Sequence, residues 1–361
     1  MRSTIKVLIV DDSALIRQML GRALSIDPRL EVVGTARNGV EAVEKALELA
    51  PDVITLDIEM PELTGIEALP YLMKATPARV VMLSSLDDSD TTYQALAQGA
   101  VDFLVKPKTG VATSLTEFSE ILIKKIMTAY RISPERRFEL RHISKPAAEL
   151  LPAARAAELP STAAKIEKIV AIAASTGGPP ALETVFSGLT AALPAAYVVV
   201  QHLPAGFTES LARRLSRVTD VHVEEGRPGV LLRPGVAYIA PHGRHMRVVG
   251  STAVRLRMED GPPMHGVRPA ADPLFMSVGE VFGPHSIGVV LTGMGSDGAQ
   301  GLKHILDGGG ETIVQDEKSS TVWGMPKAAI SAGAADRVVP LQQVAVEIRR
   351  ALREEAVLHE R

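Results

Sequence analysis

Hydrophobic positions along the chain follow two alternating patterns: short uninterrupted runs, and longer segments in which they recur every three or four residues. The first run, IKVLIV at residues 5–10, precedes a helical pattern from Ser13 to about residue 26. Strands that are apolar on both faces and alternate with helices are typical of a parallel sheet covered on both sides. The further strands expected here are residues 30–36, 53–57, 80–84 and 102–105, with helices near 39–49, 64–74, 89–98 and up to about 130.

The same alternation resumes at Lys168, after a segment of different composition. Residues 131–165 are rich in alanine, proline and charge and are interpreted as a linker with room for a short helix. The chain is therefore predicted to contain an α/β domain at 1–130, a linker, and a second α/β domain at 166–361. In the second domain, strands are expected at 169–174, 197–201, 237–239, 286–292 and 312–315, short extra strands within 221–258, and helices near 180–189, 208–215, 272–282, 297–307, 326–332 and 342–358.

The composition narrows the class of protein. A chain of 361 residues exceeds the usual single-domain size, and 46% hydrophobic content suffices for two cores. The net charge of -3 gives no electrostatic footprint for nucleic acid. The absence of cysteine excludes disulfides, thiolate metal sites and cysteine nucleophiles. The start of the chain lacks a secretory signal pattern and no apolar run reaches the ~18 residues of a membrane span, so a cytoplasmic protein without membrane insertion is expected.

Polar residues with complementary chemistry follow the strands of the first domain. Asp11 and Asp12 come after the first strand, Asp57 ends the third, Ser84 ends the fourth and Lys106 follows the fifth. Because the carboxyl ends of parallel strands meet at one edge of the sheet, these side chains are expected to lie together. Clustered carboxylates favour a hard cation such as Mg²⁺, and Lys106 and Ser84 suit phosphoryl oxygens. The set predicts a phosphate-accepting aspartate beside a metal, whereas each residue alone is also explained as a helix cap or a surface charge.

On these residues, the segment from about 4 to 128 resembles the receiver domain of response regulators, which has a flavodoxin-like fold. The resemblance implies that Asp57 is the phosphoacceptor and that the peptide bond between Lys106 and Pro107 is cis. It further implies a Mg²⁺ site and a phosphorylation switch, formed respectively by Asp11, Asp12 and Asp57 and by Ser84, Lys106 and Phe103.

In the second domain, three strand ends carry a nucleophile, a base and an acid. The sequence VAIAASTGG leaves Ser175 on a glycine turn, YVVVQHLPAGFT leaves His202 after the next strand, and IGVVLTGMGSDG leaves Asp297 after a later one. Alone, Ser175 and Asp297 are explained as helix caps, His202 as a packed or surface histidine, and STGG as a phosphate-binding turn. On one sheet edge they form a Ser–His–Asp triad, and TGMGSDG offers backbone amides for an oxyanion hole. Spacing alone leaves both interpretations open.

The motifs AASTGG, QHLPAGFT and LTGMGSDGAQG, behind a receiver domain and a linker, resemble those of the chemotaxis protein-glutamate methylesterase and glutaminase family, CheB. The resemblance covers nearly the whole chain and implies a doubly wound parallel-sheet α/β catalytic domain. It implies that Ser175 is the nucleophile, His202 the general base and Asp297 its orienting partner. It also places Thr176 and Met294 near the oxyanion site.

This resemblance implies a phosphorylation-activated serine hydrolase that demethylates glutamate methyl esters, and deamidates some glutamines, on methyl-accepting chemotaxis receptors. The implied phosphodonor is the chemotaxis histidine kinase. The implied hydrolysis needs no cofactor, and Mg²⁺ serves only the phosphorylation site. A DNA-binding output is disfavoured, because it requires a basic helix-turn-helix module that the strand–helix alternation does not provide. An inactive receptor-binding scaffold stays open, because the sequence does not show the geometry of the triad, and hydrolysis of a methylated receptor distinguishes the two.

Overall fold

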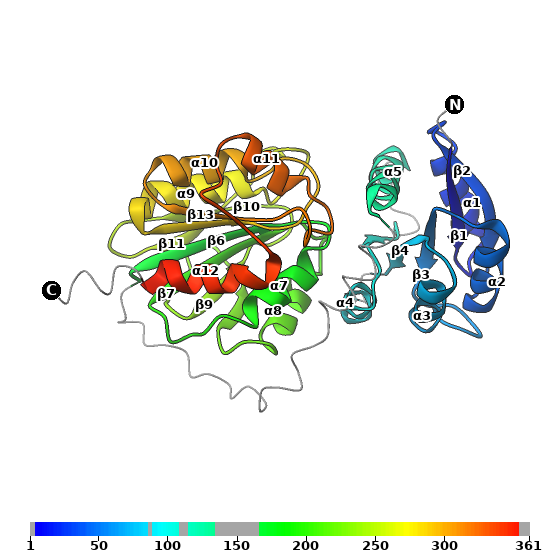
Figure 1. Cartoon of the computed structure of the whole chain (residues 1–361), viewed down its shortest axis with the longest axis horizontal. Helices are drawn as coiled ribbons and strands as arrows, with labels where there is room; N and C mark the ends of the chain where they lie inside the picture. Colours follow the sequence, from blue (N-terminus) through cyan, green and yellow to red (C-terminus); the bar gives the residue numbers. More distant parts are fainter. Residues whose placement is uncertain (1–3, 86–88, 108–114, 134–165, 354–361) are drawn as a thin grey trace. The chain divides into compact units, whose positions relative to one another are not determined.

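The computed structural model describes residues 4–85, 89–107, 115–133 and 166–353, and the chain divides into two compact units, Met1–Lys145 and Pro146–Arg361 (Figure 1). Each unit contains its own parallel sheet with helices, so the expected α/β class is confirmed for both. The expected linker and its short helix lie outside the described residues from 134 onward. Within the described ranges, no helix combines the length and the hydrophobicity needed to cross a membrane.

The first unit has a five-stranded parallel sheet in the order β2-β1-β3-β4-β5. Among the helices that flank this sheet, α1 packs beside α5, and α3 packs beside both α2 and α4. The sequence predicted all ten elements, since each apolar run became a strand and each amphipathic segment a helix. The elements are β1 (Ile5–Val10), α1 (Ala14–Leu24), β2 (Leu30–Ala36), α2 (Gly39–Leu49), β3 (Val53–Asp57), α3 (Gly65–Ala75), β4 (Arg79–Ser84), α4 (Ser89–Ala97), β5 (Asp102–Val105) and α5 (Leu115–Arg131).

Capping residues explain where three of these helices begin. The side chains of Ser13 and Asn38 each accept a hydrogen bond from the backbone N–H three residues later. Thr64 and Glu67 form a reciprocal capping box at the start of α3. These caps set the starts of the three helices at Ala14, Gly39 and Gly65.

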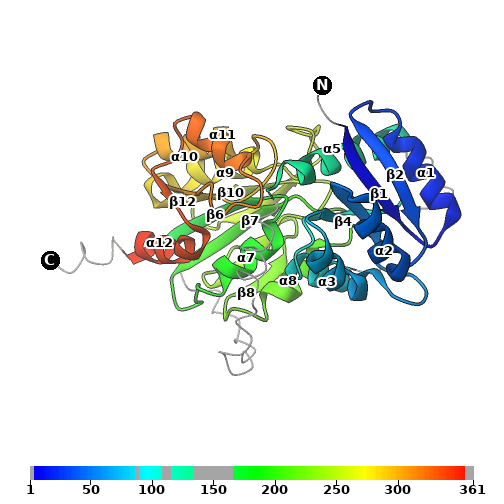
Figure 2. The ribbon, with the colours of Figure 1, turned by 45° about the vertical axis from the view of Figure 1, so that its right-hand side comes forward.

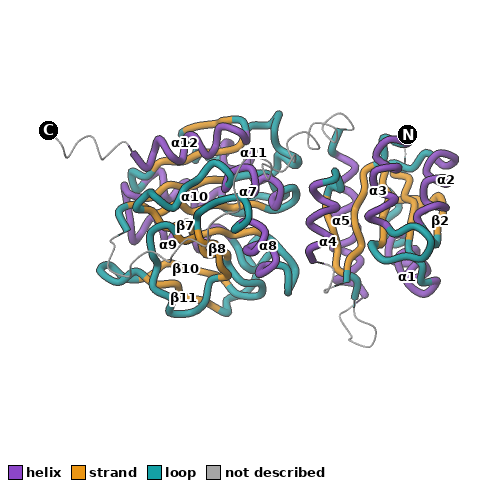
Figure 3. Tube along the Cα trace, turned by 90° about the horizontal axis from the view of Figure 1, so that it is seen from below, coloured by secondary structure: helices purple, strands orange, loops and turns teal. Residues whose placement is uncertain are grey.

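The second unit has a seven-stranded parallel sheet in the order β14-β13-β12-β6-β7-β9-β8 and a separate antiparallel pair, β10-β11 (strands are orange in Figure 3). Its strands are β6 (Lys168–Ala174), β7 (Ala195–Gln201), β8 (His222–Glu225), β9 (Val236–Ile239), β10 (His245–Val249), β11 (Arg255–Glu259), β12 (Ser286–Val290), β13 (Glu311–Gln315) and β14 (Arg337–Val339). Its helices are α7 (Gly178–Phe186), α8 (Thr208–Leu215), α9 (Ala271–Phe282), the 3₁₀ turn η3 (Gly283–His285), α10 (Ala299–Asp307), α11 (Met325–Ser331) and α12 (Leu341–Arg353).

The strand order of this sheet reverses beside β6. From β6 the chain builds β7, β9 and β8 on one side, and later β12, β13 and β14 on the other. Helices α7, α8 and α12 cover one face, and α9, α10 and α11 cover the other (Figures 1 and 2). In open α/β sheets, ligands bind beyond the carboxyl ends of the strands at such a reversal. The topology therefore directs attention to the residues that follow β6 and its two neighbours.

Several ends in the second unit differ from the prediction for local reasons. The strand expected at 286–292 ends at Val290, because the Thr292 N–H bonds to the Gln315 side chain instead of a neighbouring strand. The helix expected from residue 297 begins at Ala299, because Gly298 adopts φ +86°. The three-residue edge strand β14 was not predicted, since it is too short for a periodic pattern and ends before Pro340.

One expectation about the backbone is wrong. The single cis peptide bond between described residues joins Arg268 to Pro269, so the bond between Lys106 and Pro107 is not cis. The trans form of an X–Pro bond is favoured by roughly 0.5–1 kcal/mol, and it is the form adopted here.

Candidate functional site

The first unit gathers charged side chains at the carboxyl edge of its sheet, as expected. Oxygen atoms of Asp11, Asp12 and Asp57 lie within 4.8 Å of one another. The Lys106 Nζ lies 2.8 Å from Asp11 Oδ2 and 2.6 Å from Asp57 Oδ2. Asp11 and Asp57 are buried, whereas Asp12 is exposed. Lys106 thus contacts two buried carboxylates at the position where the sequence predicted a phosphoacceptor.

The remaining predicted residues of this edge have other partners. The Ser84 hydroxyl donates to the Ser85 carbonyl at 2.8 Å and shares a 2.7 Å hydrogen bond with the Thr92 hydroxyl. Phe103 is buried and packs edge-on against Tyr93, with ring centroids 6.5 Å apart. The Ser84 hydroxyl is therefore bonded to α4 in this structure, and Phe103 packs inward against the same helix.

Burial governs the titration of the central aspartate. It raises the pKa of Asp57 to about 6, and the charges of Asp11 and Asp12 act in the same direction. The hydrogen bond and positive charge of Lys106 oppose this rise. Burial also disfavours the charged form of Lys106, but the hydrogen bonds and charges of Asp11 and Asp57 outweigh it and place the pKa of Lys106 above its ordinary value. The edge therefore carries excess negative charge that the protein does not fully compensate.

This excess predicts a pH-dependent stability. The pKa of an aspartate in the unfolded chain is about 3.9, whereas the pKa of Asp57 in the folded protein is about 6. The proton on Asp57 therefore stabilises the folded protein fully below about pH 4, and this contribution to the free energy of unfolding is lost as pH rises through 6. We expect Asp57→Asn to remove this loss. Its free energy of unfolding at pH 7 should exceed that of the wild type by about 1–3 kcal/mol, since one pKa unit corresponds to ~1.4 kcal/mol. Calorimetry of both proteins from pH 4 to 7 without divalent cations measures the difference, and parallel curves would contradict it.

In the second unit, Ser175 and His202 follow neighbouring strands at the same level of the sheet. The last paired positions of β6 and β7 are Ala174 and Gln201. The His202 N–H donates to the Ala174 carbonyl at 3.1 Å, and the Ser175 N–H donates to the Thr292 carbonyl at 3.0 Å. Ser175 is therefore held between β7 on one side and the segment after β12 on the other.

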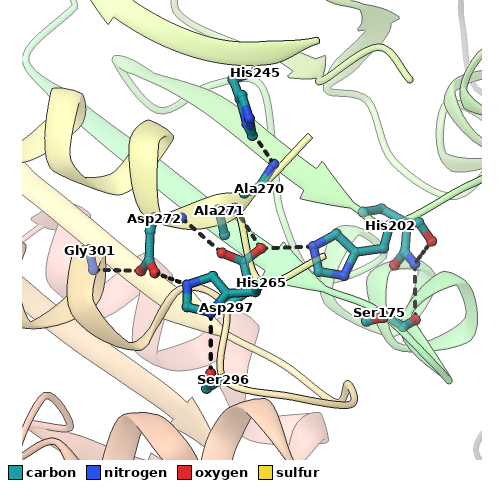
Figure 4. A network of polar contacts seen from close by, with 11 residues as sticks. Ser175, His202, His245, His265, Ala270, Ala271, Asp272, Ser296, Asp297 and Gly301 are labelled. Carbon is teal, nitrogen blue, oxygen red and sulfur yellow. Dashed lines mark hydrogen bonds and ion pairs between the residues drawn. The ribbon is translucent and has the colours of Figure 1, made fainter. Parts of the chain in front are cut away.

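His202 and Asp297 form the direct contact expected of a base and its orienting acid. The His202 Nε2 lies 2.8 Å from Asp297 Oδ2, and both side chains are largely buried (Figure 4). Because Nε2 faces the carboxylate, Nδ1 is the ring nitrogen left to accept a proton from a nucleophile. The contact joins residues 95 positions apart in the sequence, which only the adjacency of β6 with β7 and β12 makes possible.

The start of α9 anchors the Asp297 carboxylate. The backbone N–H groups of Ala271 and Asp272 donate to it at 2.7 and 3.2 Å, and the N-cap residue Ala270 has no capping side chain of its own. Burial favours the neutral acid, but the hydrogen bond and charge of His202 and these two amides outweigh it and lower the pKa of Asp297. Asp297 therefore stays ionised and holds His202 in the tautomer that carries a proton on Nε2.

Ser175 is not used as a helix cap. The N-cap residue of α7 is Gly177, and no side chain caps that helix. Between the described residues, the structure shows no hydrogen bond from the Ser175 hydroxyl to His202. The contact that it shows is the His202–Asp297 pair, with Ser175 at the end of the strand beside that of His202. Catalytic hydrogen bonds are often long in proteins without substrate.

Glycines leave the space into which Ser175 fits. A Cβ on Gly293 would lie 2.8 Å from the Ser175 Cβ, and one on Gly177, which has φ +76°, would lie 2.3 Å from Thr321 Oγ1. The Thr292 hydroxyl donates to the Thr176 carbonyl at 2.9 Å. The segment around Gly293 therefore lies against the turn that carries Ser175. The two residues expected at the oxyanion site directly follow these positions in the chain: Thr176 follows Ser175, and Met294 follows Gly293.

A second His–Asp pair lies beside the first and was not predicted. The His265 Nε2 lies 2.7 Å from Asp272 Oδ2, and the buried Asp272 also accepts from the Gly301 N–H at 2.7 Å (Figure 4). Asp297 thus caps α9, while Asp272 of α9 caps α10. The signal in the sequence is the HG pair at 265–266, where both residues have positive φ in a two-residue turn.

Comparison with known proteins identifies the family. The CheB methylesterase family profile matches residues 170–348, and the response regulator receiver domain profile matches residues 7–113. The chain is 45% identical over 354 residues to the protein-glutamate methylesterase/protein-glutamine glutaminase of Pyrococcus horikoshii, covering 96% of this chain and 94% of that relative. The chain belongs to the CheB family.

Other CheB proteins extend the comparison. The protein-glutamate methylesterase/protein-glutamine glutaminase 1 of Xanthomonas campestris pv. campestris is 45% identical over 352 residues, 96% of each chain. The crystal structure of the Thermotoga maritima CheB methylesterase catalytic domain is 37% identical and has a TM-score of 0.50, covering 52% of this chain and 98% of that one. The resemblance found in the sequence is confirmed for the family, and a receiver followed by a methylesterase domain is the CheB arrangement found here.

Proposed function

We propose that this CheB protein is a phosphorylation-activated serine hydrolase that removes methyl groups from glutamate methyl esters on methyl-accepting chemotaxis receptors and deamidates some of their glutamines. The observation that carries the proposal is the His202–Asp297 contact at the reversal of the sheet, with Ser175 at the end of the adjoining strand. The curated relatives at 45% identity over 96% of the chain, which carry the name methylesterase/glutaminase, support the same reaction.

The proposed chemistry is acyl transfer in two steps. His202 Nδ1 takes the Ser175 proton as the hydroxyl oxygen attacks the glutamyl carbonyl carbon, and Asp297 stabilises the resulting imidazolium. The same proton then passes to the ester oxygen, or to the amide nitrogen of a glutamine, as the bond from that atom to the glutamyl carbon breaks, which releases methanol or ammonia and leaves the acyl-enzyme. Water attacks next with His202 again as the base, which frees the glutamate and the serine. Backbone amides near Thr176 and Met294 are the proposed oxyanion donors. Ser175, His202, the leaving group and water account for every proton transfer, so hydrolysis is proposed to need no cofactor.

The proposed regulatory site is the acidic edge of the receiver. Asp57 is the proposed phosphoacceptor, with Ser84, Lys106 and Phe103 as the switch residues. The three carboxylates of Asp11, Asp12 and Asp57 offer the hard oxygen ligands that Mg²⁺ prefers, and their uncompensated charge fits a divalent cation. When bound there, Mg²⁺ would neutralise negative charge during phosphoryl transfer.

The proposed partners follow from the same assignment. Methyl-accepting receptors are the substrates, and the chemotaxis histidine kinase is the phosphodonor. The net charge of -3 supports no nucleic-acid partner. A cytoplasmic location, where receptor methylation sites and kinase are both reached, is part of the proposal.

The test is hydrolysis of a receptor fragment with labelled glutamate methyl esters. The purified chain should release methanol, and a fragment with glutamine at the same positions should release ammonia. A chain that binds the fragment without releasing either product would be a scaffold, and the proposed function would be rejected.

Phosphorylation should raise this activity only through Asp57. With Mg²⁺ and a small-molecule phosphodonor, we expect methanol release to rise between severalfold and ~100-fold, the range covered by a shift from ~1% to ~99% active protein. Asp57→Asn should keep the basal rate and lose the response, because an amide cannot form the acyl phosphate. Asp52→Asn, whose carboxylate only accepts from the Lys6 N–H, is the matched control and should respond normally. An Asp57→Asn protein that still responds would place the phosphoacceptor elsewhere.

A further inference from the structure

One buried side chain touches the backbone of both proposed catalytic residues. Gln201 ends β7 and is 2% exposed. Its Nε2 donates to the Ser175 carbonyl at 2.9 Å and to the His202 carbonyl at 3.1 Å. An amide nitrogen has two hydrogens, so Gln201 donates one to the carbonyl of the proposed nucleophile and the other to the carbonyl of the proposed base.

The chemistry of these contacts sets the orientation of the carboxamide. Both atoms that face it are carbonyl oxygens, which only the NH₂ end can satisfy. The other end, Oε1, is buried and has no hydrogen-bond partner in the described part of the chain. A buried acceptor without a partner is unfavourable, so the side chain is poorly explained as a contribution to stability alone.

The surrounding backbone leaves room for this carboxamide. A Cβ on Gly178, the first residue of α7, would lie 1.9 Å from Gln201 Oε1, so any larger residue would displace the amide. The Gly178 N–H also donates to the Ser175 carbonyl at 2.7 Å. The nucleophile turn therefore has two donors on one carbonyl, one from its own turn and one from the strand that carries the base.

The position of these contacts gives them a specific effect. The last backbone hydrogen bond between the two chain segments is His202 N–H to the Ala174 carbonyl, after which Ser175 turns toward α7 and His202 toward α8. Gln201 is the bridge between the segments beyond that bond. Its loss would let the Ser175 turn move relative to His202, and a displacement of 1 Å in a catalytic geometry can cost ~100-fold in rate.

We propose that Gln201 is a positioning residue that sets the separation between the Ser175 nucleophile and the His202 base. The inference rests on the proposed function, because it takes the roles of these two residues from it. The contacts of Gln201 are to the backbone carbonyls of these residues and not to the Ser175 hydroxyl or the His202 ring. It acts through the two carbonyl groups that it holds.

Two variants test the proposal on the full-length protein with the methylated receptor fragment. Gln201→Met keeps the length of the side chain and removes both donors, and we expect kcat to fall ~100-fold while KM changes less than about threefold. Gln201→Glu is nearly isosteric but turns a carboxylate toward two carbonyl oxygens, so its kcat should fall further. The rate of Ser175 labelling by a fluorophosphonate should fall in the same order.

The control is another buried polar side chain with two backbone contacts in the same domain. Ser277 is 2% exposed, accepts from the Val248 N–H and donates to the Leu274 carbonyl. Ser277→Ala should lower the thermal unfolding temperature and leave kcat unchanged.

The proposal would be overturned by a kcat of Gln201→Met within threefold of the wild type, by a loss seen in KM rather than kcat, or by a loss no greater than that of Ser277→Ala. Failure of Gln201→Met to fold would assign the residue to stability and would overturn it too. Ser175→Ala distinguishes failure of the proposed function from failure of this inference. If Ser175→Ala stays active, the proposed function fails. If Ser175→Ala is inactive and the Gln201 variants stay active, only the inference about Gln201 is rejected.

Discussion

Replacing Ser175 with alanine is expected to abolish methanol release from a methylated receptor, with a loss on the order of a million-fold in kcat. The substitution removes the hydroxyl of the proposed nucleophile, which follows β6 at the level where His202 follows β7, and without it no acyl-enzyme forms. The fold should be retained, because this hydroxyl caps no helix: the N-cap of α7 is Gly177 and uses no side chain. The thermal unfolding temperature should therefore match that of the wild type.

A serine at the other end of the same helix provides the control. Ser187 follows α7, and its hydroxyl donates to the Thr184 carbonyl on an exposed surface. Ser187→Ala should keep full activity. Near-native activity in Ser175→Ala would show that the serine is not the nucleophile and that the proposed mechanism is wrong.

Asp297→Asn is expected to lower kcat by ~10⁴-fold, which is less than the loss of the nucleophile. Asp297 Oδ2 accepts from both His202 Nε2 and the Ala271 N–H, whereas Oδ1 accepts from the Asp272 N–H, so an asparagine whose carbonyl keeps the Asp272 contact turns its NH₂ group toward His202 Nε2. That nitrogen must then accept a hydrogen bond, so the ring proton moves to Nδ1. A protonated Nδ1 cannot take the proton of Ser175, and the positive charge formed during attack also loses its carboxylate partner.

The neighbouring His–Asp pair supplies a matched control for Asp297. Asp272 is buried to the same degree, accepts from a histidine and from a backbone amide, and belongs to the same network, but its histidine is His265. Asp272→Asn should reduce stability, since the cap of α10 weakens, and should reduce kcat far less than Asp297→Asn. Equal losses in the two variants would contradict the assignment of Asp297 as the partner of the base. A Ser175→Ala/Asp297→Asn double variant should be no slower than Ser175→Ala alone, because the residues act as one unit.

The order of apolar and polar residues along the chain determined the strands of this protein and the residues at their carboxyl ends. Runs such as IKVLIV and VVVQ are strands because apolar residues on both faces suit the interior of a parallel sheet, and polar residues directly after them must lie at its carboxyl edge. That pattern predicts Asp57 and Lys106 on one edge and Ser175, His202 and Asp297 on another, and the Lys106–Asp57 and His202–Asp297 contacts agree with it. The motifs then identified the CheB family, which the relatives confirm.

Tertiary structure alone decided which of these strand ends meet and through which atoms. Strand order in a parallel sheet depends on crossovers between segments far apart in the sequence, so no local pattern reveals that β6 lies between β12 and β7. Three contacts depend on side-chain directions that are set only when helices α7 and α9 pack onto the sheet. They are the contact of His202 Nε2 with Asp297, the pair of His265 with Asp272, and the hydrogen bonds from Gln201 to the Ser175 and His202 carbonyls. The sequence by itself thus determined which chemical groups reach the edge of the sheet, and packing between distant segments determined their partners, because a hydrogen bond requires a distance and a direction that residue order along the chain does not specify.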